Sequence, residues 1–466
     1  MMMTDRNKNM ARRVAKEVDK AGGRTFYVGG YVRDEILGLE NKDIDIEVHG
    51  IPVKTLEDIL DSLGTRLKIG TSFGIMGLRG YDLDIAMPRS EVATGRGHKD
   101  FEVFVDPFLG EEKAARRRDF TMNAMMEDVL TGEILDFFGG QEDLERKRIR
   151  HVDDQSFVED PLRVFRAAQF AARFGFTVAE ETTALSSTMD VAALPAERIM
   201  GELEKALLKA PKPSVFFEEL RKMHQLSVWF PELEATQEIQ QGAQHHPEGN
   251  VWIHTMQVLD EAARMKEEAR EPLWFLLSAI CHDLGKLVTT SLGKDGRIHA
   301  YEHEKKGVPI AERLLLRIVN ETKLLKYVLN MVELHMRPNG LIRDNARTLS
   351  FMKLFDRSVC PEDLLLLAKA DQIGSVGPGT DREAIVASYI ETERKLREYL
   401  AFYQERMSRP YVMGRDLLEA GARPGPLIGE IINELHGFRL SGKSREDQMK
   451  HALASIRGQA EQKRKE

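Results

Sequence analysis

A pair of glycines followed by a strand with two aspartates constrains the fold of this 466-residue chain more than any other feature. Residues 25–28, Thr-Phe-Tyr-Val, predict a short buried strand, and the following Gly29 and Gly30 predict a tight turn. Residues 43–48, Asp-Ile-Asp-Ile-Glu-Val, alternate acidic and apolar side chains, which is typical of a half-buried strand. The start of the chain is therefore expected to form a small mixed sheet with helices.

Asp43 and Asp45 are two residues apart on this expected strand, so both carboxylates leave the same face of the sheet. Two hard oxygen ligands suit Mg²⁺, and a pair of Mg²⁺ ions can activate an attacking hydroxyl and hold a leaving pyrophosphate. Gly29 and Gly30 let backbone N–H groups approach a triphosphate closely. An Asp-x-Asp pair alone also fits an ordinary strand with one solvated face, but behind a glycine turn it indicates nucleotidyl-transfer chemistry.

Further motifs follow in order along the chain. Residues 83–86, Leu-Asp-Ile-Ala, contain a third acidic position at Asp84. Residues 117–124 read Arg-Arg-Asp-Phe-Thr-Met-Asn-Ala, residues 159–163 read Glu-Asp-Pro-Leu-Arg, and Glu197-Arg198 comes later. Together with the first motif they resemble the polymerase-β-like nucleotidyltransferase superfamily, and within it the bacterial tRNA nucleotidyltransferases (CCA-adding enzymes) and the related bacterial poly(A) polymerases.

This resemblance implies a template-independent enzyme that adds CMP and AMP to tRNA 3′ ends, with tRNA, CTP and ATP as partners and Mg²⁺ as cofactor. It gives Asp43, Asp45 and Asp84 the catalytic carboxylate positions, with Mg²⁺ held by the first two. The nucleotide-binding positions that it implies are Gly29, Gly30 and Arg33 for the phosphates, Arg117, Arg118, Asp119 and Asn123 for the ribose and triphosphate, and Asp160, Arg163 and Arg166 for the base.

The base-reading pair also has a physical explanation. Asp160 and Arg163 are three residues apart, so on a helix they project from one face. A carboxylate only accepts hydrogen bonds and a guanidinium only donates them, which complements the amino group and ring acceptor of cytosine and of adenine. Uracil and guanine present a carbonyl in place of that amino group and are expected to be rejected. The same spacing also fits a surface ion pair.

Several functions stay open within this chemistry. The segment from Arg89 to Asp106 is expected to form a mobile basic loop of the kind that a switch from CTP to ATP requires, and CC-adding members of the family shorten it. An A-adding enzyme, a poly(A) polymerase and a CC-adding enzyme remain alternatives. Another class is a nucleotide or phosphate-ester phosphohydrolase with a regulatory nucleotidyltransferase-like head, against which the intact Asp43, Asp45 and Asp160 argue.

A second set of polar residues, histidines and aspartates between His254 and Asp371, lies beyond the polar stretch 237–249, in a region of helical periodicity. Imidazoles and carboxylates spaced in this way along helices suit a divalent metal held between those helices. Residues 281–286, Cys-His-Asp-Leu-Gly-Lys, resemble the HD domain, a metal-dependent phosphohydrolase module that occurs with active and with silent sites. The implied ligands are His254, His282, Asp283 and Asp371, with His303 and His335 similar to the extra histidines of members that hold two metals.

The fold class expected from these motifs is α+β: a polymerase-β-like head of mixed sheet and helices, then an all-α neck, an HD domain and a helical C-terminal part. The expected bounds are 1–150 for the head, 151–236 for a neck that recognises base and RNA, 237–380 for the HD domain, and 381–466 for a helical part that contacts tRNA. A chain of this length suits two to four domains.

Composition adds a few limits. The chain has only two cysteines and no apolar run near the length of a membrane span, so we expect a cytoplasmic protein without a membrane partner. The net charge is −8, so RNA binding requires local basic patches such as residues 116–118, Arg-Arg-Arg. The sequence does not determine the oligomeric state, the metal of the HD domain or its substrate.

Overall fold

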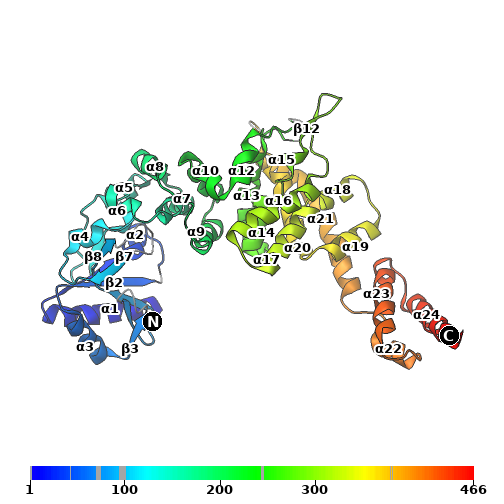
Figure 1. Ribbon diagram of the computed structural model, residues 1–466, viewed down its shortest axis with the longest axis horizontal. Helices are drawn as coiled ribbons and strands as arrows, with labels where there is room; N and C mark the ends of the chain where they lie inside the picture. Colours follow the sequence, from blue (N-terminus) through cyan, green and yellow to red (C-terminus); the bar gives the residue numbers. More distant parts are fainter. Residues whose placement is uncertain are drawn as a thin grey trace. The chain divides into compact units, whose positions relative to one another are not determined.

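The computed structural model describes residues 3–41, 43–69, 75–93, 101–242, 246–377, 379 and 381–465. By density of contacts the chain divides into two compact units, Met1–Trp229 and Phe230–Glu466. The first unit holds a mixed sheet with helices, and the second is almost entirely helical (Figure 1). This arrangement confirms the α+β fold class, with a sheet-containing head followed by helical regions.

A seven-stranded sheet forms the centre of the first unit, in the order β3-β4-β5-β2-β1-β8-β9. Strand β2 pairs antiparallel with β1 and parallel with β5, so it lies inside the sheet. Ile44 and Ile46 are buried while Asp45 between them is exposed, as the alternating pattern predicts. The strands are β1 (Arg24–Val28), β2 (Ile44–His49), β3 (Arg66–Ile69), β4 (Ile75–Leu78), β5 (Leu83–Ala86), β8 (Met126–Asp128) and β9 (Ile134–Leu135).

Helices pack around this sheet. Helix α1 (Met3–Lys20) contacts β1, β2 and α3 (Val53–Leu63), and α2 (Gly30–Ile36) starts directly after β1 (Figure 1). The expected loop at 89–106 begins and ends in an antiparallel hairpin of β6 (Arg89–Ala93) and β7 (Phe101–Val105), while its residues 94–100 lie outside the described residues. The chain continues through α4 (Glu111–Arg116), the short 3-10 helix η1 (Thr121–Asn123) and α5 (Gly140–Glu145).

The rest of the first unit is mostly helical. Helix α7 packs against α9 and α10, and it ends just before Gly175, whose φ of 66° is a left-handed conformation that favours glycine. Pro195 directly precedes α9. The elements are β10 (Arg148–Ile149), α6 (Asp154–Val158), α7 (Leu162–Phe174), β11 (Thr177–Val178), α8 (Glu180–Ser186), α9 (Ala196–Lys209), α10 (Ser214–Lys222) and α11 (Leu226–Trp229).

The second unit is built around α13 and α14. Helix α13 packs against α14 and α20, and α17 packs against α14 and α16. A Cβ at Gly374 would lie 2.9 Å from the backbone N of Val258, so α20 and α13 are in close contact at this glycine. The elements are α12 (Pro231–Ala235), η2 (Thr236–Glu238), α13 (Val251–Met265), η3 (Lys266–Glu268), α14 (Pro272–Cys281), α15 (Lys286–Thr289), β12 (Ser291–Leu292), β13 (Ile298–His299), α16 (His303–Ile318), α17 (Thr322–Leu334), α18 (Arg337–Arg343), α19 (Thr348–Arg357), α20 (Pro361–Gly374) and α21 (Arg382–Met407).

The last helices share an apolar core of their own. Helices α22 (Gly414–Glu419), α23 (Pro426–Leu440) and α24 (Arg445–Lys465) bury Leu417, Ile431 and other apolar side chains among themselves. They form the orange and red end of the chain in Figure 1. Among the helices of the described ranges, none is long and apolar enough to cross a membrane.

Candidate active site and metal cluster

The three carboxylates expected to take part in catalysis lie on two neighbouring strands. Asp45 on β2 is directly in register with Asp84 on β5. Asp43 immediately precedes β2, and all three side chains are exposed. Asp82 belongs to the same group, because its charge helps to raise the pKa values of Asp45 and Asp84. Asp82 was not among the predicted site residues, although Asp82-Leu-Asp84 repeats the Asp-x-Asp pattern of the first pair.

The carboxylates repel one another. Partial loss of hydration and the neighbouring charge of Asp84 raise the pKa of Asp45, although the Arg118 guanidinium acts in the opposite sense. Partial loss of hydration and the charge of Asp82 likewise raise the pKa of Asp84. A bound divalent cation would relieve this repulsion. Hard carboxylate oxygens on one face of a sheet therefore fit Mg²⁺.

The glycine turn at Gly29 lies beside Arg118, an arginine of the motif at residues 117–124. Gly29 links β1 to α2 with φ +68°, a backbone conformation that favours glycine. A Cβ at Gly29 would lie 3.0 Å from Nη1 of Arg118, so the guanidinium lies directly against the turn. Glu47 holds Arg118 at 3.4 Å and also lies 2.8 Å from Nε2 of His49. Glu47 was not among the predicted site residues, although it continues the acidic alternation of Asp43 and Asp45.

Arg33 lies inside the protein rather than on the surface of the turn. Its residue surface is 3% exposed, Nε donates to Oδ1 of Asp34 at 2.8 Å, and Nη1 donates to Oδ1 of Asn123 at 2.7 Å. The Phe174 ring lies 4.7 Å from its guanidinium carbon. This geometry directs the Arg33 guanidinium toward Asp34 and Asn123 inside the protein, so its expected direct contact with phosphate is not supported. The Arg33 guanidinium packs against the turn instead, since a Cβ at Gly30 would lie 3.2 Å from its Nη2.

Asp119 and Asn123 continue this buried network. Nδ2 of Asn123 donates to Oδ1 of Asp119 at 3.0 Å, and Nε of Arg166 donates to Oδ2 of Asp119 at 2.7 Å. Burial alone would raise the pKa of Asp119, but the Arg166 charge and the hydrogen bond from Asn123 outweigh burial and lower it. Arg166 also reaches Glu202 on α9 at 3.9 Å. The network thus connects the glycine turn with helices α7 and α9.

The base-reading residues are arranged differently from the expected pair. Asp160 lies before α7 rather than on it, and Arg163 lies in the first turn of that helix. Oδ2 of Asp160 accepts a hydrogen bond at 2.9 Å from Arg198, which belongs to the later Glu197-Arg198 motif. Arg163 instead donates to the main-chain oxygen of Arg117 at 2.8 Å. The side chain of Arg117 donates in turn to the main-chain oxygen of Arg89.

The six polar residues expected in the HD domain meet in the interior of the second unit. The Nε2 atoms of His254 and His282 are 3.3 Å apart, and those of His303 and His335 are 3.4 Å apart. Asp283 lies between the two pairs. Its Oδ2 is 3.4 Å from Nε2 of both His254 and His282, and its Oδ1 is 3.3 Å from Nε2 of His303.

Asp371 completes one side of this cluster. Its Oδ1 lies 3.0 Å from Nε2 of His254 and 3.8 Å from Nε2 of His282. One carboxylate, Asp283, is therefore shared by two groups of donors. The first group is His254, His282 and Asp371, and the second is His303 and His335.

The hydrogen bonds of the histidines support metal binding. In three of the rings Nδ1 lies 2.8 Å from the main-chain oxygen three residues earlier, so Nδ1 carries the proton, because a carbonyl only accepts. Nε2 of each neutral ring is then an acceptor, and acceptors that face each other need a proton or a cation between them. Imidazoles with carboxylates suit a divalent transition metal. The three contacts are His282 to Ala279, His303 to Ala300 and His335 to Val332.

Two histidines of the cluster have opposite pKa shifts. Burial and the nearby His282 lower the pKa of His335 to about 3. Burial alone would lower the pKa of His254, but hydrogen bonds to Asp371 and Glu248 raise it to about 9. Without a metal, the cluster therefore holds a proton at His254 while His335 stays neutral. A metal at Nε2 of His254 would replace that proton.

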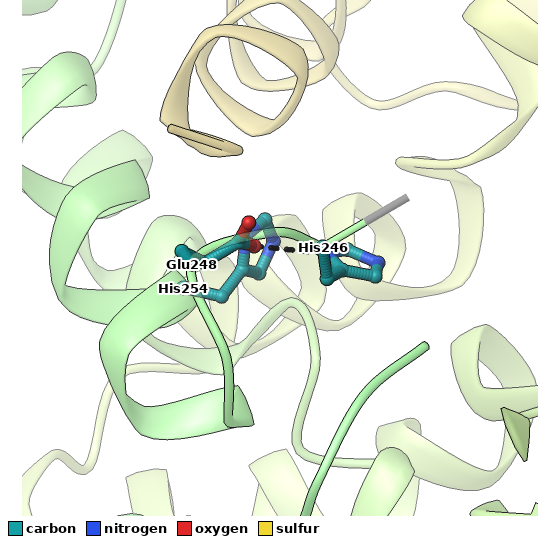
Figure 2. Close-up of side chains that lie close together, drawn as sticks. All are labelled: His246, Glu248 and His254. Atoms are coloured by element: carbon teal, nitrogen blue, oxygen red, sulfur yellow. Dashed lines mark hydrogen bonds and ion pairs between the residues drawn. The ribbon is translucent and has the colours of Figure 1, made fainter. Parts of the chain in front are cut away.

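Two charged residues beside the cluster were not among the predicted ligands. Nζ of Lys286 lies 2.7 Å from Oδ2 of Asp283, and Oε1 of Glu248 lies 2.8 Å from Nδ1 of His254 (Figure 2). Lys286 ends the Cys-His-Asp-Leu-Gly-Lys motif, so the sequence offered a signal for it. Glu248 lies in the polar stretch 237–249 that precedes α13.

Three segments of the chain match known family models. Residues 25–150 match the poly A polymerase head domain, residues 175–236 match the probable RNA and SrmB-binding site of polymerase A, and residues 251–373 match the HD domain. These matches agree with the carboxylate group on the sheet and with the histidine cluster. The protein therefore belongs to the class of nucleotidyltransferases that carry an HD domain after the head domain.

Relatives extend this similarity over most of the chain. The multifunctional CCA protein of Pasteurella multocida is 38% identical over 422 residues, which cover 88% of this chain and 94% of the relative. The multifunctional CCA protein of Thioalkalivibrio sulfidiphilus is 36% identical over 369 residues, which cover 76% of this chain and 86% of the relative. The chain belongs to the family of multifunctional CCA proteins.

Solved structures share the fold. A CCA-adding enzyme in complex with ATP aligns with a TM-score of 0.63 at 20% identity, over 96% of this chain and 94% of that one. The Thermotoga maritima CCA-adding enzyme complexed with tRNA aligns with a TM-score of 0.60 at 20% identity, over 96% and 95%. At this identity the likeness concerns the fold.

Proposed function

We propose that this protein adds CMP and AMP to the 3′ end of tRNA, without a template, by two-metal nucleotidyl transfer. The observation that carries the proposal is the register of Asp45 with Asp84, beside Asp43 and close to the turn at Gly29 and Arg118. Membership of the multifunctional CCA protein family supports the same reaction. The proposed partners are tRNA, CTP and ATP, as in the related structures that contain ATP, CTP or tRNA.

In this proposal Asp43 and Asp45 hold Mg²⁺, with Asp84 beside them. Bound Mg²⁺ supplies the positive charge that activates the 3′ hydroxyl and stabilises the leaving pyrophosphate. The backbone at Gly29 and the guanidinium of Arg118 lie where they can bind phosphate oxygens. The remaining predicted nucleotide-binding residues, Gly30, Arg33, Arg117, Asp119, Asn123 and Arg166, are assigned to positioning of the nucleotide, directly or through the buried network.

Selection of the base is assigned to Asp160 and Arg163. The carboxylate of Asp160 accepts from the amino group of cytosine or adenine, and the guanidinium of Arg163 donates to the neighbouring ring nitrogen. Arg198 holds Asp160 at 2.9 Å and so orients its carboxylate. Arg163 would have to exchange a contact to the main chain for a contact to the base. Uracil and guanine would oppose a carbonyl to the carboxylate, which accounts for their exclusion.

One experiment tests the reaction and its alternatives. The purified protein is incubated with Mg²⁺, each labelled NTP and tRNAs that end before CCA, after the first C or after the second C. Incorporation of two CMP and one AMP is expected. Incorporation of CMP alone indicates a CC-adding enzyme, and AMP alone indicates an A-adding enzyme or, if many residues are added, a poly(A) polymerase. No incorporation from any primer contradicts the proposal.

We further propose that the second unit is a metal-dependent phosphohydrolase. The observation that favours this activity is the pair of donor groups that share Asp283. Nucleotidyltransferases and HD domains both use divalent metals in general. Proposed substrates are phosphomonoesters and 2′,3′-cyclic phosphates, to be tested with Ni²⁺, Mn²⁺, Co²⁺ or Mg²⁺. The other-class alternative, a phosphohydrolase whose head is only regulatory, predicts this hydrolysis without any nucleotide addition.

The HD site is expected to be separable from nucleotide addition, because its donors all belong to the second unit and the catalytic carboxylates all belong to the first. His282→Ala together with Asp283→Asn is expected to release the bound metal and to abolish hydrolysis. CMP and AMP addition should persist in the same preparation. Loss of both activities in a protein that remains folded would contradict their independence.

The domain bounds also stand as proposals: a head at 1–150, a neck at 151–236, an HD domain at 237–380 and a tRNA-contacting part at 381–466. The match of residues 251–373 to the HD domain supports the third of these. A cytoplasmic location is proposed as well. Cys281 and Cys360 both carry free thiols, which suits a reducing compartment.

A further inference from the structure

Glu248 connects the metal cluster to a histidine outside it. Its Oε1 lies 2.8 Å from Nδ1 of His254 and 2.9 Å from Nδ1 of His246 (Figure 2). The side chain of Glu248 is fully buried, and the two imidazole centroids are 4.8 Å apart. One buried carboxylate oxygen is therefore shared by two imidazole rings.

These contacts determine which ring nitrogens carry protons. A carboxylate only accepts, so Nδ1 of His246 is the donor in its hydrogen bond with Glu248, while Nδ1 of His254 lies at ion-pair distance from the same oxygen. When His254 is neutral, as it is with a metal bound, its Nε2 is the acceptor. Nε2 of His254 points into the cluster, toward Asp283 and Asp371. Nε2 of His246 lies 3.4 Å from Nζ of Lys286.

The ammonium of Lys286 lies next to Nε2 of His246 and can donate a hydrogen bond to it. Its Nζ is 2.6 Å from Oε1 of Gln241, 2.7 Å from Oδ2 of Asp283 and 3.4 Å from Nε2 of His246. An ammonium has three N–H donors, and three acceptors surround this one. The contacts close into a ring whose members are His254, Glu248, His246, Lys286 and Asp283.

His254 differs from the other three histidines of the cluster in its Nδ1 partner. The others each use the main-chain oxygen three residues earlier. His254 lies in the first turn of α13, near the asparagine cap Asn250, and its Nδ1 lies against the Glu248 carboxylate. A carboxylate forms a charge-assisted bond and makes the imidazole a more basic ligand than a carbonyl does.

We propose that Glu248 is a positioning residue of the HD metal site. Its Oε1, 2.8 Å from Nδ1 of His254, orients that ring so that Nε2 faces the metal, and His246, which Lys286 contacts, holds Glu248 in place. The inference rests on the proposed metal site. Histidine ligands generally donate their second N–H to such a partner, and removal of the partner lowers metal affinity by about 10–100-fold.

The test measures Co²⁺ binding to the full-length, metal-free protein. Affinity is obtained by competition with a chelator, and the visible d–d bands of bound Co²⁺ report the coordination geometry. Glu248→Ala is expected to weaken Co²⁺ binding about 10–100-fold and to shift the bands, because the His254 ring is no longer held. Glu248→Gln keeps an accepting oxygen and should retain the bands with a smaller loss. The matched control is Glu238→Ala, an exposed glutamate of the same unit.

His246→Ala removes the outer support and keeps Glu248, so a smaller loss of Co²⁺ affinity is expected, below about tenfold. Wild-type affinity and bands in a folded Glu248→Ala protein overturn the inference and leave the metal site standing. If Glu248→Ala does not fold, wild-type binding by both Glu248→Gln and His246→Ala overturns it. A wild-type protein that binds no Co²⁺ overturns the metal site and the inference together, while CMP and AMP addition still reports on the head.

Discussion

Asp45 on β2 and Asp84 on β5 are direct partners in a parallel strand pair, so two carboxylates lie next to each other on the sheet. Each has a raised pKa, in part because other carboxylates lie close by. Water does not fully screen such repulsion when the groups lose hydration. This pair therefore opposes folding in the absence of a cation and attracts Mg²⁺ in its presence.

The first prediction concerns catalysis. Asp45→Asn, like Asp43→Ala or Asp45→Ala, is expected to abolish CMP and AMP incorporation, because an oxygen ligand for Mg²⁺ is lost from an exposed site and the fold does not depend on it. Incorporation of labelled CTP and ATP into tRNA that lacks CCA measures the effect at saturating Mg²⁺. Asp19→Asn, an exposed aspartate on α1, is the matched control. Substantial activity in Asp45→Asn would refute the assignment.

The same substitution is expected to stabilise the metal-free protein. A raised pKa means that the folded state binds more protons than the unfolded chain as the pH rises above about 4, so the stability falls through that window. Asparagine removes the charge, so Asp45→Asn should raise Tm at pH 7.5 in EDTA and should have less effect near pH 4. The gain is expected to stay below about 1 kcal/mol because Asp45 is exposed. Mg²⁺ should reverse the order of the two melting temperatures.

The second prediction concerns base selection. Asp160→Ala and Arg163→Ala are expected to raise the fraction of UMP or GMP incorporated, since a good hydrogen-bond pair to a base discriminates by roughly 1–3 kcal/mol. Arg198→Ala should shift selectivity in the same direction by less, because it frees the Asp160 carboxylate that it holds at 2.9 Å. Primer extension with each NTP measures the ratio. The control is Arg221→Ala, in a half-buried pair on α10.

A double-mutant cycle separates this explanation from a merely structural role of Arg198. If Arg198 acts through Asp160, the double substitution Asp160→Ala with Arg198→Ala should have the selectivity of Asp160→Ala alone. Fully additive losses would mean that Arg198 acts on its own. Wild-type selectivity in all variants would mean that another element chooses the base.

Local sequence patterns predicted the parts of the fold that depend on near neighbours. The alternation of acidic and apolar residues placed Asp45 on an exposed strand face, between the buried Ile44 and Ile46. Burial of Arg33 was not predictable from its motif, because one partner, Asn123, is 90 residues away in sequence. The register of Asp45 with Asp84 likewise depends on strand order, which spacing alone does not determine.

The metal cluster shows the same division. The donors stand in recognisable motifs, since a metal site needs particular residue types, and the structure brings all six together. The proposed role of Glu248 depends instead on the path of the chain just before α13, which brings the Glu248 carboxylate against His254. A residue that orients a ligand through a hydrogen bond has no fixed spacing to that ligand, so its sequence signal is weak.

The third prediction concerns the buried arginine of the first motif. Arg33→Ala is expected to destabilise the protein by about 3–5 kcal/mol, because it leaves the buried carboxylate of Asp34 without its main partner. Arg33→Ala combined with Asp34→Asn should recover part of this loss, as the charge is then absent. Denaturant unfolding of the full chain measures both. Arg79→Ala, on an exposed turn, is the control.

This prediction also distinguishes a supporting role from phosphate binding. A residue that binds phosphate directly would raise KM for CTP and ATP when replaced by lysine, with little change in stability. Arg33→Lys is expected instead to lower the stability with little change in KM, because lysine cannot donate to Asp34 and Asn123 in the same forked geometry. A stable Arg33→Lys variant with a raised KM would return Arg33 to the phosphate site.

The last prediction concerns pH and a pair of acids in the head. Glu127 on β8 lies next to Glu35 on α2, and burial together with the charge of Glu35 raises the pKa of Glu127 to about 7. Lys8 and Arg12 on α1 act in the opposite sense. Between about pH 4.5 and pH 7 the folded state therefore binds more protons than the unfolded chain. The stability is lost progressively as the pH rises through this window.

Glu127→Gln removes the titrating group, so it is expected to stabilise the protein at pH 8 and to be neutral or slightly destabilising at pH 4.5. The gain at pH 8 should be about 1 kcal/mol, because solvent screens a group that is only partly buried. Urea unfolding at the two pH values and constant ionic strength measures the difference. Glu40→Gln, an exposed glutamate of the same unit, should show none. Equal effects of Glu127→Gln at both pH values would mean that the pKa of Glu127 is not raised in the folded protein.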